Sequence, residues 1–319
     1  MSTGDAKTNR PVVLAFLMTT MALGSIEGTI VATAMPSIVS TLGGFELFSW
    51  VFSAYLLTQA VFTPISGSLA DTLGRKPVLL VSIAVFLVAS AACGFADSMP
   101  QLIAFRFVQG VGAAGINTMV VTLAGDLYTV RERGRVQAYL ASVWGVSSVL
   151  GPLIGGLLVA YVDWSWVFWF NIPFGIAALF GLSRYLHESV GSRTRRLDLQ
   201  GAALLFVAMA GLMVLLNQGS SLGQPLRVGL GVFTLVIASW LVRRLLTVPG
   251  AILPLDLWRD RLILLANLSA FVAGVVMIGV ISYAPAYVQG VMGYAPLIAG
   301  FALSTMSLGW PLASSLAGR

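Results

Sequence analysis

The sequence predicts an all-α polytopic membrane protein, and three observations support that fold class. The chain has 319 residues, of which 58% are hydrophobic and only 9% are charged, whereas charged residues make up about 25% of a soluble protein. Its mean hydropathy is +0.92. Long apolar runs recur along the chain, and basic residues gather in every second loop between them. A soluble chain with so few charges could not cover its surface, so we predict a bundle of membrane-spanning helices.

Ten apolar runs follow one another along the chain, and a helix of about 20 residues is long enough to cross a bilayer. The runs do not alternate apolar and polar residues at every second position, which excludes a membrane β-barrel. We predict helices over residues 11–34, 47–66, 78–96, 101–125, 136–161, 165–183, 200–218, 226–242, 262–285 and 296–316. The first run follows Lys7 and Arg10 as a signal peptide would, but it is too long and contains Glu27, so we predict a retained span.

The basic residues set the predicted orientation of the spans. Of the 18 lysines and arginines, 16 precede the first span or follow an even-numbered one, and the exceptions are Arg227 and Arg106. Because basic loops stay in the cytoplasm, we predict a multi-pass protein of the inner (cytoplasmic) membrane with a cytoplasmic N-terminus. The net charge of +6 therefore reflects topology and attraction to a lipid bilayer, not nucleic-acid binding.

Several function classes are excluded by what the sequence contains. Cys93 is the single cysteine and His187 the single histidine, so neither an intrachain disulfide framework nor a cysteine–histidine metal site is expected. The glycines of residues 110–115 spell G-x-G-x-x-G, but they lie inside an apolar span with no strand before them, which argues against dinucleotide binding. No nucleophile–base pair recurs in the spans and no Walker motif is visible, so we predict neither an enzyme nor an ATP-driven pump.

A weak internal repeat predicts how the spans are grouped. Pro36 and Pro64, which we expect to close the first two helices, are matched by Pro285 and Pro311, and similar small-residue segments follow Pro64 and Pro311. Transporters are often built from such repeats. We predict a six-helix bundle over 1–185, two inserted helices with cytoplasmic linkers over 186–261, and the start of a second six-helix bundle over 262–319. On this interpretation about 10 helices of an expected 14 are present, and the C-terminally truncated chain is not expected to transport by itself.

Four motifs occur in order on successive predicted spans. The first span contains Glu27-Gly-Thr-Ile-Val-Ala-Thr-Ala-Met-Pro36, and the fourth contains Leu102-Ile-Ala-Phe-Arg106-Phe-Val-Gln-Gly-Val-Gly112. A glycine-rich loop follows the second span, and a glycine-rich segment begins at Trp144 in the fifth. The loop positions are Gly67, Asp71, Gly74, Arg75 and Lys76, and the fifth-span positions are Gly145, Gly151, Pro152, Gly155 and Gly156.

Together these motifs resemble those of the major facilitator superfamily, and the first resembles that of its fourteen-span drug:proton antiporters. Three positions depart from the family pattern: Glu27 stands where Asp is common, Thr72 where a basic residue is common, and Ser147 where Gly is frequent. The resemblance implies a major facilitator-type helical bundle. It also implies that the loop motif, with Asp126 as a further member, latches the inward-closed conformation and that the fifth-span motif forms a tight seam favouring exchange. The plainer alternatives are basic residues that only anchor topology and glycines that only permit close packing.

Glu27 and Arg106 are the only charged residues well inside predicted spans, where charges are costly and mark functional sites. At about 1.5 Å per residue, Glu27 lies ~10 Å and Arg106 ~8 Å from the outer ends of their helices, so the two side chains share one layer and could meet. A carboxyl group whose contact with a cation and with water changes with conformation can take up and release a proton. We predict that Glu27 couples protons and that Arg106 tunes it; a fixed structural ion pair is the alternative.

The predicted function is drug:proton antiport, the export of small lipophilic and cationic compounds or antibiotics by alternating access. The expected energy source is the proton gradient, with no cofactor, and the expected partners are a small-molecule substrate, protons and lipid, with no obligate protein partner. Aromatic faces attract cations, and the candidate substrate residues are Trp50, Gln59, Asn117 and Trp144. For each of these residues alone, the favoured alternative is a role in packing or at the membrane interface. Two alternatives remain: a secondary transporter of a specific metabolite, and a non-transporting membrane sensor or scaffold.

Overall fold

The computed structural model describes residues 8–188, 198–219, 221–248, 258 and 260–307, and it is helical with short turns throughout these ranges. The elements are α1 (Arg10–Leu42), the 3-10 helix η1 (Phe45–Leu47), α2 (Phe48–Leu73), α3 (Arg75–Gly94), α4 (Met99–Leu127), α5 (Val130–Tyr161), α6 (Trp166–Trp169), α7 (Asn171–Tyr185), α8 (Leu199–Gln218), α9 (Gln224–Thr247), α10 (Arg261–Gly290) and α11 (Pro296–Ser307). Within the described residues, nine helical segments are long and apolar enough to cross a membrane, with α6 and α7 forming one of them. The predicted all-helical membrane fold is therefore confirmed.

The tenth predicted span, 296–316, begins as α11, and its remainder lies outside the described residues together with Pro311. The expectation that Pro36 and Pro64 close the first two helices is wrong. Both prolines lie inside their helices, which continue to Leu42 and Leu73. In a packed membrane bundle, neighbouring helices and side chains can satisfy the backbone groups that a proline leaves free, so the helix continues through it.

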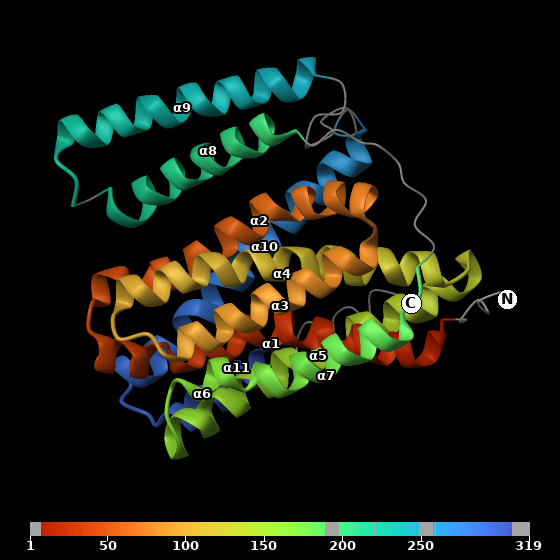
Figure 1. Cartoon of the computed structure of the whole chain (residues 1–319). Coiled ribbons are helices and arrows are strands. Elements are labelled where there is room, and N and C mark those ends of the chain that lie inside the picture. The colour runs from red at the N-terminus through yellow and green to blue at the C-terminus, as the bar shows by residue number, and fades with distance from the viewer. Residues whose placement is uncertain (1–7, 189–197, 220, 249–257, 259, 308–319) are drawn as a thin grey trace, which may run out of the picture.

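The helices run in alternating directions, so the turns lie at two opposite ends of the molecule (Figure 1). The turn between α2 and α3 consists of Gly74 alone, with φ 93° and ψ 156°. A residue with a side chain is strained at such a positive φ, so this glycine permits α3 to begin directly after α2. The basic residues beside it, Arg75 and Lys76, thereby form the first turn of α3.

Helices α1 to α7 enclose two apolar clusters. One contains Leu17 and Leu23 of α1 with Ala113 of α4, and the other contains Ile30 of α1 with Leu102 of α4. Glu27 on α1 and Arg106 on α4 both fall between the two clusters along their helices. The only charged side chains of this core therefore lie in a layer with apolar packing on both sides.

The remaining helices pack on this bundle in two places. The α8–α9 hairpin lies against α2, with α9 outermost (Figure 1), and Asn217 Nδ2 donates to Ser53 Oγ at 3.3 Å. Helix α10 packs on α1 and α11 on α5. Gln289 Nε2 of α10 donates to the Thr33 carbonyl at 3.0 Å, and Ser304 Oγ of α11 donates to the Val149 carbonyl at 2.6 Å. The three-part division at residues 185 and 261 stays a prediction.

Candidate functional site

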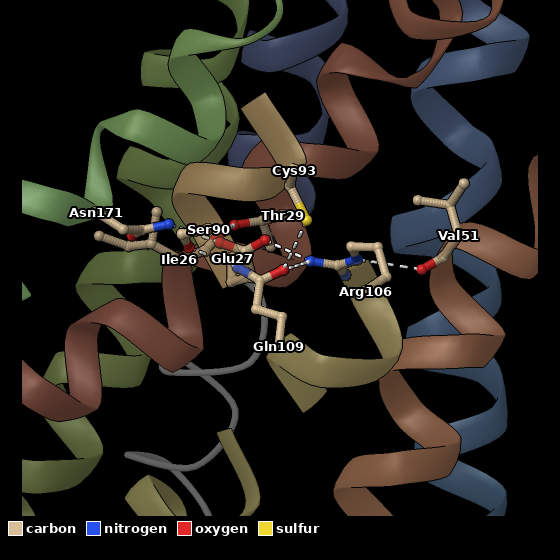
Figure 2. Close-up of polar contacts among 9 residues, drawn as sticks. All are labelled: Ile26, Glu27, Thr29, Val51, Ser90, Cys93, Arg106, Gln109 and Asn171. Carbon is tan, nitrogen blue, oxygen red and sulfur yellow. Dashed lines mark hydrogen bonds and ion pairs between the residues drawn. The ribbon is translucent and has the colours of Figure 1, made fainter. Parts of the chain in front are cut away.

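The centre of the candidate site is the Glu27 carboxylate on α1. Glu27 is fully buried, and each of its two oxygens accepts a hydrogen bond. Oε1 accepts from Arg106 Nη1 of α4, and Oε2 accepts from Asn171 Nδ2 of α7 at 2.7 Å (Figure 2). The two charged side chains that the sequence placed in one layer thus form an ion pair, 79 residues apart in the chain.

Besides Glu27, the Arg106 guanidinium has two hydrogen-bond acceptors and two aromatic rings around it. Nη1 also donates to Gln109 Oε1 at 2.6 Å, and Nε donates to the Val51 carbonyl of α2 at 3.2 Å. The Tyr55 ring lies 4.3 Å from the guanidinium carbon, and the Phe168 ring lies 6.0 Å from it. A guanidinium over an aromatic face gains about 0.5–2 kcal/mol. Arg106 therefore has neutral partners that do not depend on the charge of Glu27.

Gln109 extends this polar network to α3. Its Nε2 donates to Ser90 Oγ at 2.7 Å, and its Oε1 lies 3.8 Å from Cys93 Sγ (Figure 2). The network now joins α1, α2, α3, α4 and α7 around one ion pair. Buried charges are tolerated when they are paired and hydrogen-bonded, and this network satisfies both conditions.

Two residues of this network, Gln109 and Asn171, were not among the site residues predicted from the sequence. Gln109 stands inside the Arg106 motif, and its position one helical turn after Arg106 is the signal that could have identified it. Asn171 follows an aromatic run and is 144 residues from Glu27. No local pattern links those two positions.

A second cluster lies at the end of the bundle where α2 turns into α3. Arg75 Nε is 2.8 Å from Asp126 Oδ2 of α4, so Asp126, the further member that the resemblance implied for the loop motif, pairs with Arg75. Asp71 lies in the last turn of α2, and Gly67 packs near Thr118 of α4, where a Cβ would be 3.8 Å from the threonine methyl.

Glu188, which belongs to none of the sequence motifs, caps α3. Its two carboxylate oxygens accept from the backbone N–H groups of Arg75 at 2.9 Å and Lys76 at 2.8 Å. Lys76 Nζ in turn donates to the carbonyls of Ser183 at 2.8 Å and Leu186 at 2.6 Å. A carboxylate at a helix N-terminus is favourable because it pairs with free N–H groups and with the positive end of the helix dipole. The end of α7 and the residues after it therefore hold the loop motif in place.

The fifth-span motif packs α5 against helices on two sides. A Cβ at Gly151 would collide with Thr29 Oγ1 of α1, and one at Gly155 would lie 2.9 Å from the Ile30 carbonyl. On the other side, a Cβ at Gly156 would lie 3.0 Å from the Pro296 carbonyl of α11. Pro152 is within α5, and its carbonyl faces Gly300 of α11. Gly145 precedes this seam, and its carbonyl accepts from Ser148 Oγ at 2.8 Å.

Ser147, where the family motif often has glycine, accepts a hydrogen bond from Ser25 Oγ of α1 at 2.8 Å. The departure from the motif therefore adds a polar contact between α1 and α5. The glycines of the G-x-G-x-x-G run likewise serve packing, because a Cβ at Gly112 would lie 2.6 Å from the Phe86 backbone nitrogen of α3.

The four candidate substrate residues lie on three helices. Trp50 and Gln59 are on α2, Asn117 on α4 and Trp144 on α5. Trp50 Nε1 and Asn117 Oδ1 are buried polar atoms without a hydrogen-bond partner, and Trp144 is 43% exposed. Their role in substrate binding stays a prediction.

Known proteins match this chain over most of its length. The family description of the Major Facilitator Superfamily matches residues 12–319. The multidrug transporter protein MdtP of Bacillus subtilis (strain 168) is 33% identical over 328 residues, covering 100% of this chain and 60% of MdtP. Multidrug resistance protein 3 of the same strain is 36% identical over 325 residues, covering 100% of this chain and 63% of that protein. The chain thus spans about three-fifths of the length of these relatives.

Solved structures match the fold. A bacterial homologue of the human lysosomal transporter Spinster, in an inward-facing and unoccupied conformation, has a TM-score of 0.60 at 19% identity, covering 94% of this chain and 60% of the other. The D-xylose–proton symporter has a TM-score of 0.56 at 12% identity, covering 94% and 66%. The family match, the identity to the bacterial relatives and this fold show that the chain belongs to the Major Facilitator Superfamily of membrane transporters.

Proposed function

We propose that this chain acts in proton-coupled efflux of small lipophilic, cationic compounds across the cytoplasmic membrane, with its N-terminus in the cytoplasm. Glu27 is the proton-coupling carboxylate and Arg106 tunes it. The observation that carries the proposal is the fully buried ion pair between them, in the layer between two apolar clusters. Ionisable groups at such a depth are costly, so they are kept where they serve a function.

The partners of Arg106 support a cycle of protonation. When Glu27 accepts a proton, Arg106 loses its counter-charge, and an unpaired guanidinium inside the bundle would be strongly unfavourable. The carbonyl oxygens of Gln109 and Val51 and the Tyr55 ring remain beside it. Glu27 can therefore alternate between charged and neutral forms without leaving Arg106 bare.

The names of the relatives support the substrate class. Both bacterial proteins described above are multidrug proteins, and the candidate substrate residues Trp50 and Trp144 supply aromatic faces of the kind that attract cations. The proton gradient supplies the energy. The loop motif around the Arg75–Asp126 pair latches the inward-closed conformation, as the family resemblance implies.

The test is Glu27→Gln in the full-length protein, measured as uptake of a cationic dye into inverted membrane vesicles energised by a pH gradient. We expect proton-driven uptake to be lost, because glutamine cannot exchange a proton, while exchange of labelled for unlabelled dye continues. Glu27→Asp, which restores the residue type common in the family, should retain part of the uptake. Asp97→Asn, a matched change at an exposed carboxylate between α3 and α4, should leave uptake unchanged.

Undiminished proton-driven uptake in Glu27→Gln would refute the proposal. A competition assay with cationic dyes, sugars and amino acids separates drug efflux from transport of a specific metabolite. Displacement of the dye by other lipophilic cations alone supports drug efflux, and displacement by one sugar or amino acid supports a metabolite transporter.

A further inference from the structure

Two amide side chains interact with Glu27, and they differ in their other contacts. The Gln109 amide already accepts from Arg106 and donates to Ser90, whereas no other partner holds Asn171 among its described contacts, so Asn171 is the partner that can both donate to Glu27 and accept from it. It is the first residue of α7, it is 1% exposed, and its Nδ2 donates to Glu27 Oε2 at 2.7 Å (Figure 2). The other carboxylate oxygen, Oε1, is occupied by Arg106. Arginine carries only donors, whereas an asparagine amide carries two N–H donors and one acceptor oxygen.

This difference determines where a proton can reside on Glu27. A proton on Oε1 would point at the N–H groups of Arg106, so two donors would face each other. A proton on Oε2 instead faces Asn171, whose amide can turn over and present its oxygen. Protonation on Oε2 therefore converts an N–H···O contact from Asn171 to Glu27 into an O–H···O contact from Glu27 to Asn171.

We propose that Asn171 is a positioning residue that assigns the transported proton to Oε2 of Glu27 and reverses its own hydrogen bond when that proton binds. This inference rests on the proposed function, because it concerns the same carboxyl group. The reversal makes the start of α7 respond to the protonation state of a residue on α1.

The surroundings of Asn171 allow the response to reach other helices. Two residues earlier, Trp169 Nε1 donates to the Ala91 carbonyl of α3 at 3.3 Å, and a Cβ at Gly94 would collide with the Trp169 ring. The Arg106 guanidinium carbon lies over the Phe168 ring, 6.0 Å from its centroid. The α6–α7 junction is thus packed against α3 and lies beside Arg106 of α4, and turning of the Asn171 amide changes the polar contacts of a junction that is otherwise held by aromatic packing.

Other titratable groups also face Glu27 and must be considered in any pH profile. Among the described residues these are Arg106 on α4, Tyr55 on α2 and Cys93 on α3. Arg106 is the ion-pair partner of Glu27, and Tyr55 and Cys93 lie beside the pair. The variants below leave all three in place.

The first test is Asn171→Leu in the full-length protein, since leucine has a similar size but neither donor nor acceptor. We expect proton-driven dye uptake to fall by about tenfold or more, the effect of one hydrogen bond to a charged group. We also expect its dependence on pH to flatten while dye exchange stays close to wild type. Thermal stability in detergent should fall, because Oε2 of the buried Glu27 loses its donor. Equal losses of uptake and exchange, with the wild-type dependence on pH retained, would mean that Asn171 is only structural and would overturn the inference.

The second test reverses the polarity of the contact. In Glu27→Gln/Asn171→Asp, the glutamine amide donates to an acceptor at position 171, and a titratable carboxyl group remains at the site. We expect this double variant to recover proton-driven uptake that Glu27→Gln alone lacks. Glu27→Gln/Asn217→Asp is the matched control, since it adds a carboxyl group on α8, which contributes no residue to the network around Glu27, and it should recover nothing.

The outcomes separate this inference from the proposed function. If Glu27→Gln alone retains full proton-driven uptake, the proposed function fails and the inference fails with it. If Glu27→Gln abolishes uptake while Asn171→Leu keeps the wild-type pH profile, only the inference fails. Failure of the polarity-reversed double variant to exceed its control, with both proteins folded, also overturns the inference.

Discussion

Among the described residues, two arginine–carboxylate pairs join α4 to another helix of the bundle, Glu27–Arg106 to α1 and Arg75–Asp126 to α3, and the two pairs differ in their exposure to solvent. Arg106 and Glu27 have side chains that are 1% and 0% exposed, whereas Arg75 and Asp126 have side chains that are 37% and 42% exposed. An exposed pair contributes about 0–1 kcal/mol, because water competes for both partners. Removing one partner of a buried pair costs about 3–5 kcal/mol, because the other charge is left bare.

This difference suits the two pairs to different tasks. The Arg75–Asp126 pair can open and close at little cost in free energy, as a latch between conformations must. The Glu27–Arg106 pair cannot simply separate, so a change there has to pass through protonation of Glu27 and the neutral partners of Arg106. Burial, not residue type, distinguishes the proposed coupling site from the proposed latch.

The largest expected effect comes from breaking the buried pair. Arg106→Ala leaves the Glu27 carboxylate without its cation, and we expect the free energy of unfolding to fall by about 3–5 kcal/mol. Arg75→Ala, the matched change in the exposed pair, should cost about 1 kcal/mol or less. Unfolding of the two purified variants in detergent micelles gives both values, and equal losses would contradict the comparison.

A double variant sharpens this result. Glu27→Gln/Arg106→Met removes both charges together, so it should recover much of the stability that Arg106→Ala loses. Proton-driven uptake should stay absent in the double variant, which would separate the contribution of the pair to folding from its contribution to transport.

An intermediate effect is expected where α5 closes on α1, the helix that carries Glu27. Gly155→Val places a side chain against the Ile30 carbonyl, and overpacking of this kind costs about 1–3 kcal/mol. Gly28→Ala is the matched control on α1, since a Cβ there meets nothing within 4 Å. Unfolding measurements should show a lower free energy of unfolding for Gly155→Val and no loss for Gly28→Ala. A loss of the same size in both variants would contradict the close approach of Gly155 on α5 to Ile30 on α1.

The smallest effect is expected in the cluster around the α2–α3 turn. Glu188→Ala removes the carboxylate that caps α3, and loss of a helix cap costs about 0.5–2 kcal/mol. Because this cap fixes the first turn of α3, we expect the turnover of dye transport to change more than stability does. Glu46→Ala, at an exposed carboxylate of η1, is the control, and equal behaviour of the two variants would argue against a role for Glu188.

Much of the fold could be predicted because each span carries its own signal of length and hydropathy. The Glu27–Arg106 contact could be predicted as well, since these are the only charged residues well inside the predicted spans. The depth predicted for Glu27 was wrong, because it assumed a helix that ends near residue 34, whereas α1 continues to Leu42. Asn171 could not, because one asparagine beside an aromatic run looks the same whether it faces lipid or a carboxylate. Glu188 could not either, since its function depends on where the end of α7 meets the α2–α3 turn. The ends predicted for the first two helices at Pro36 and Pro64 were wrong, because proline ends a helix by a local rule that does not hold inside a packed membrane bundle.

The long separation between Glu27 and its partners has a consequence for the synthesis of the protein. Glu27 is made 79 residues before Arg106 and 144 residues before Asn171. At a synthesis rate of roughly 5–20 residues per second, Arg106 is synthesised about 4–16 s after Glu27. A lone charged residue at the centre of a membrane helix costs about 2.5–3.5 kcal/mol during insertion. The proposed coupling site therefore forms late in assembly. It is complete only when α7, which begins with Asn171, has joined the bundle.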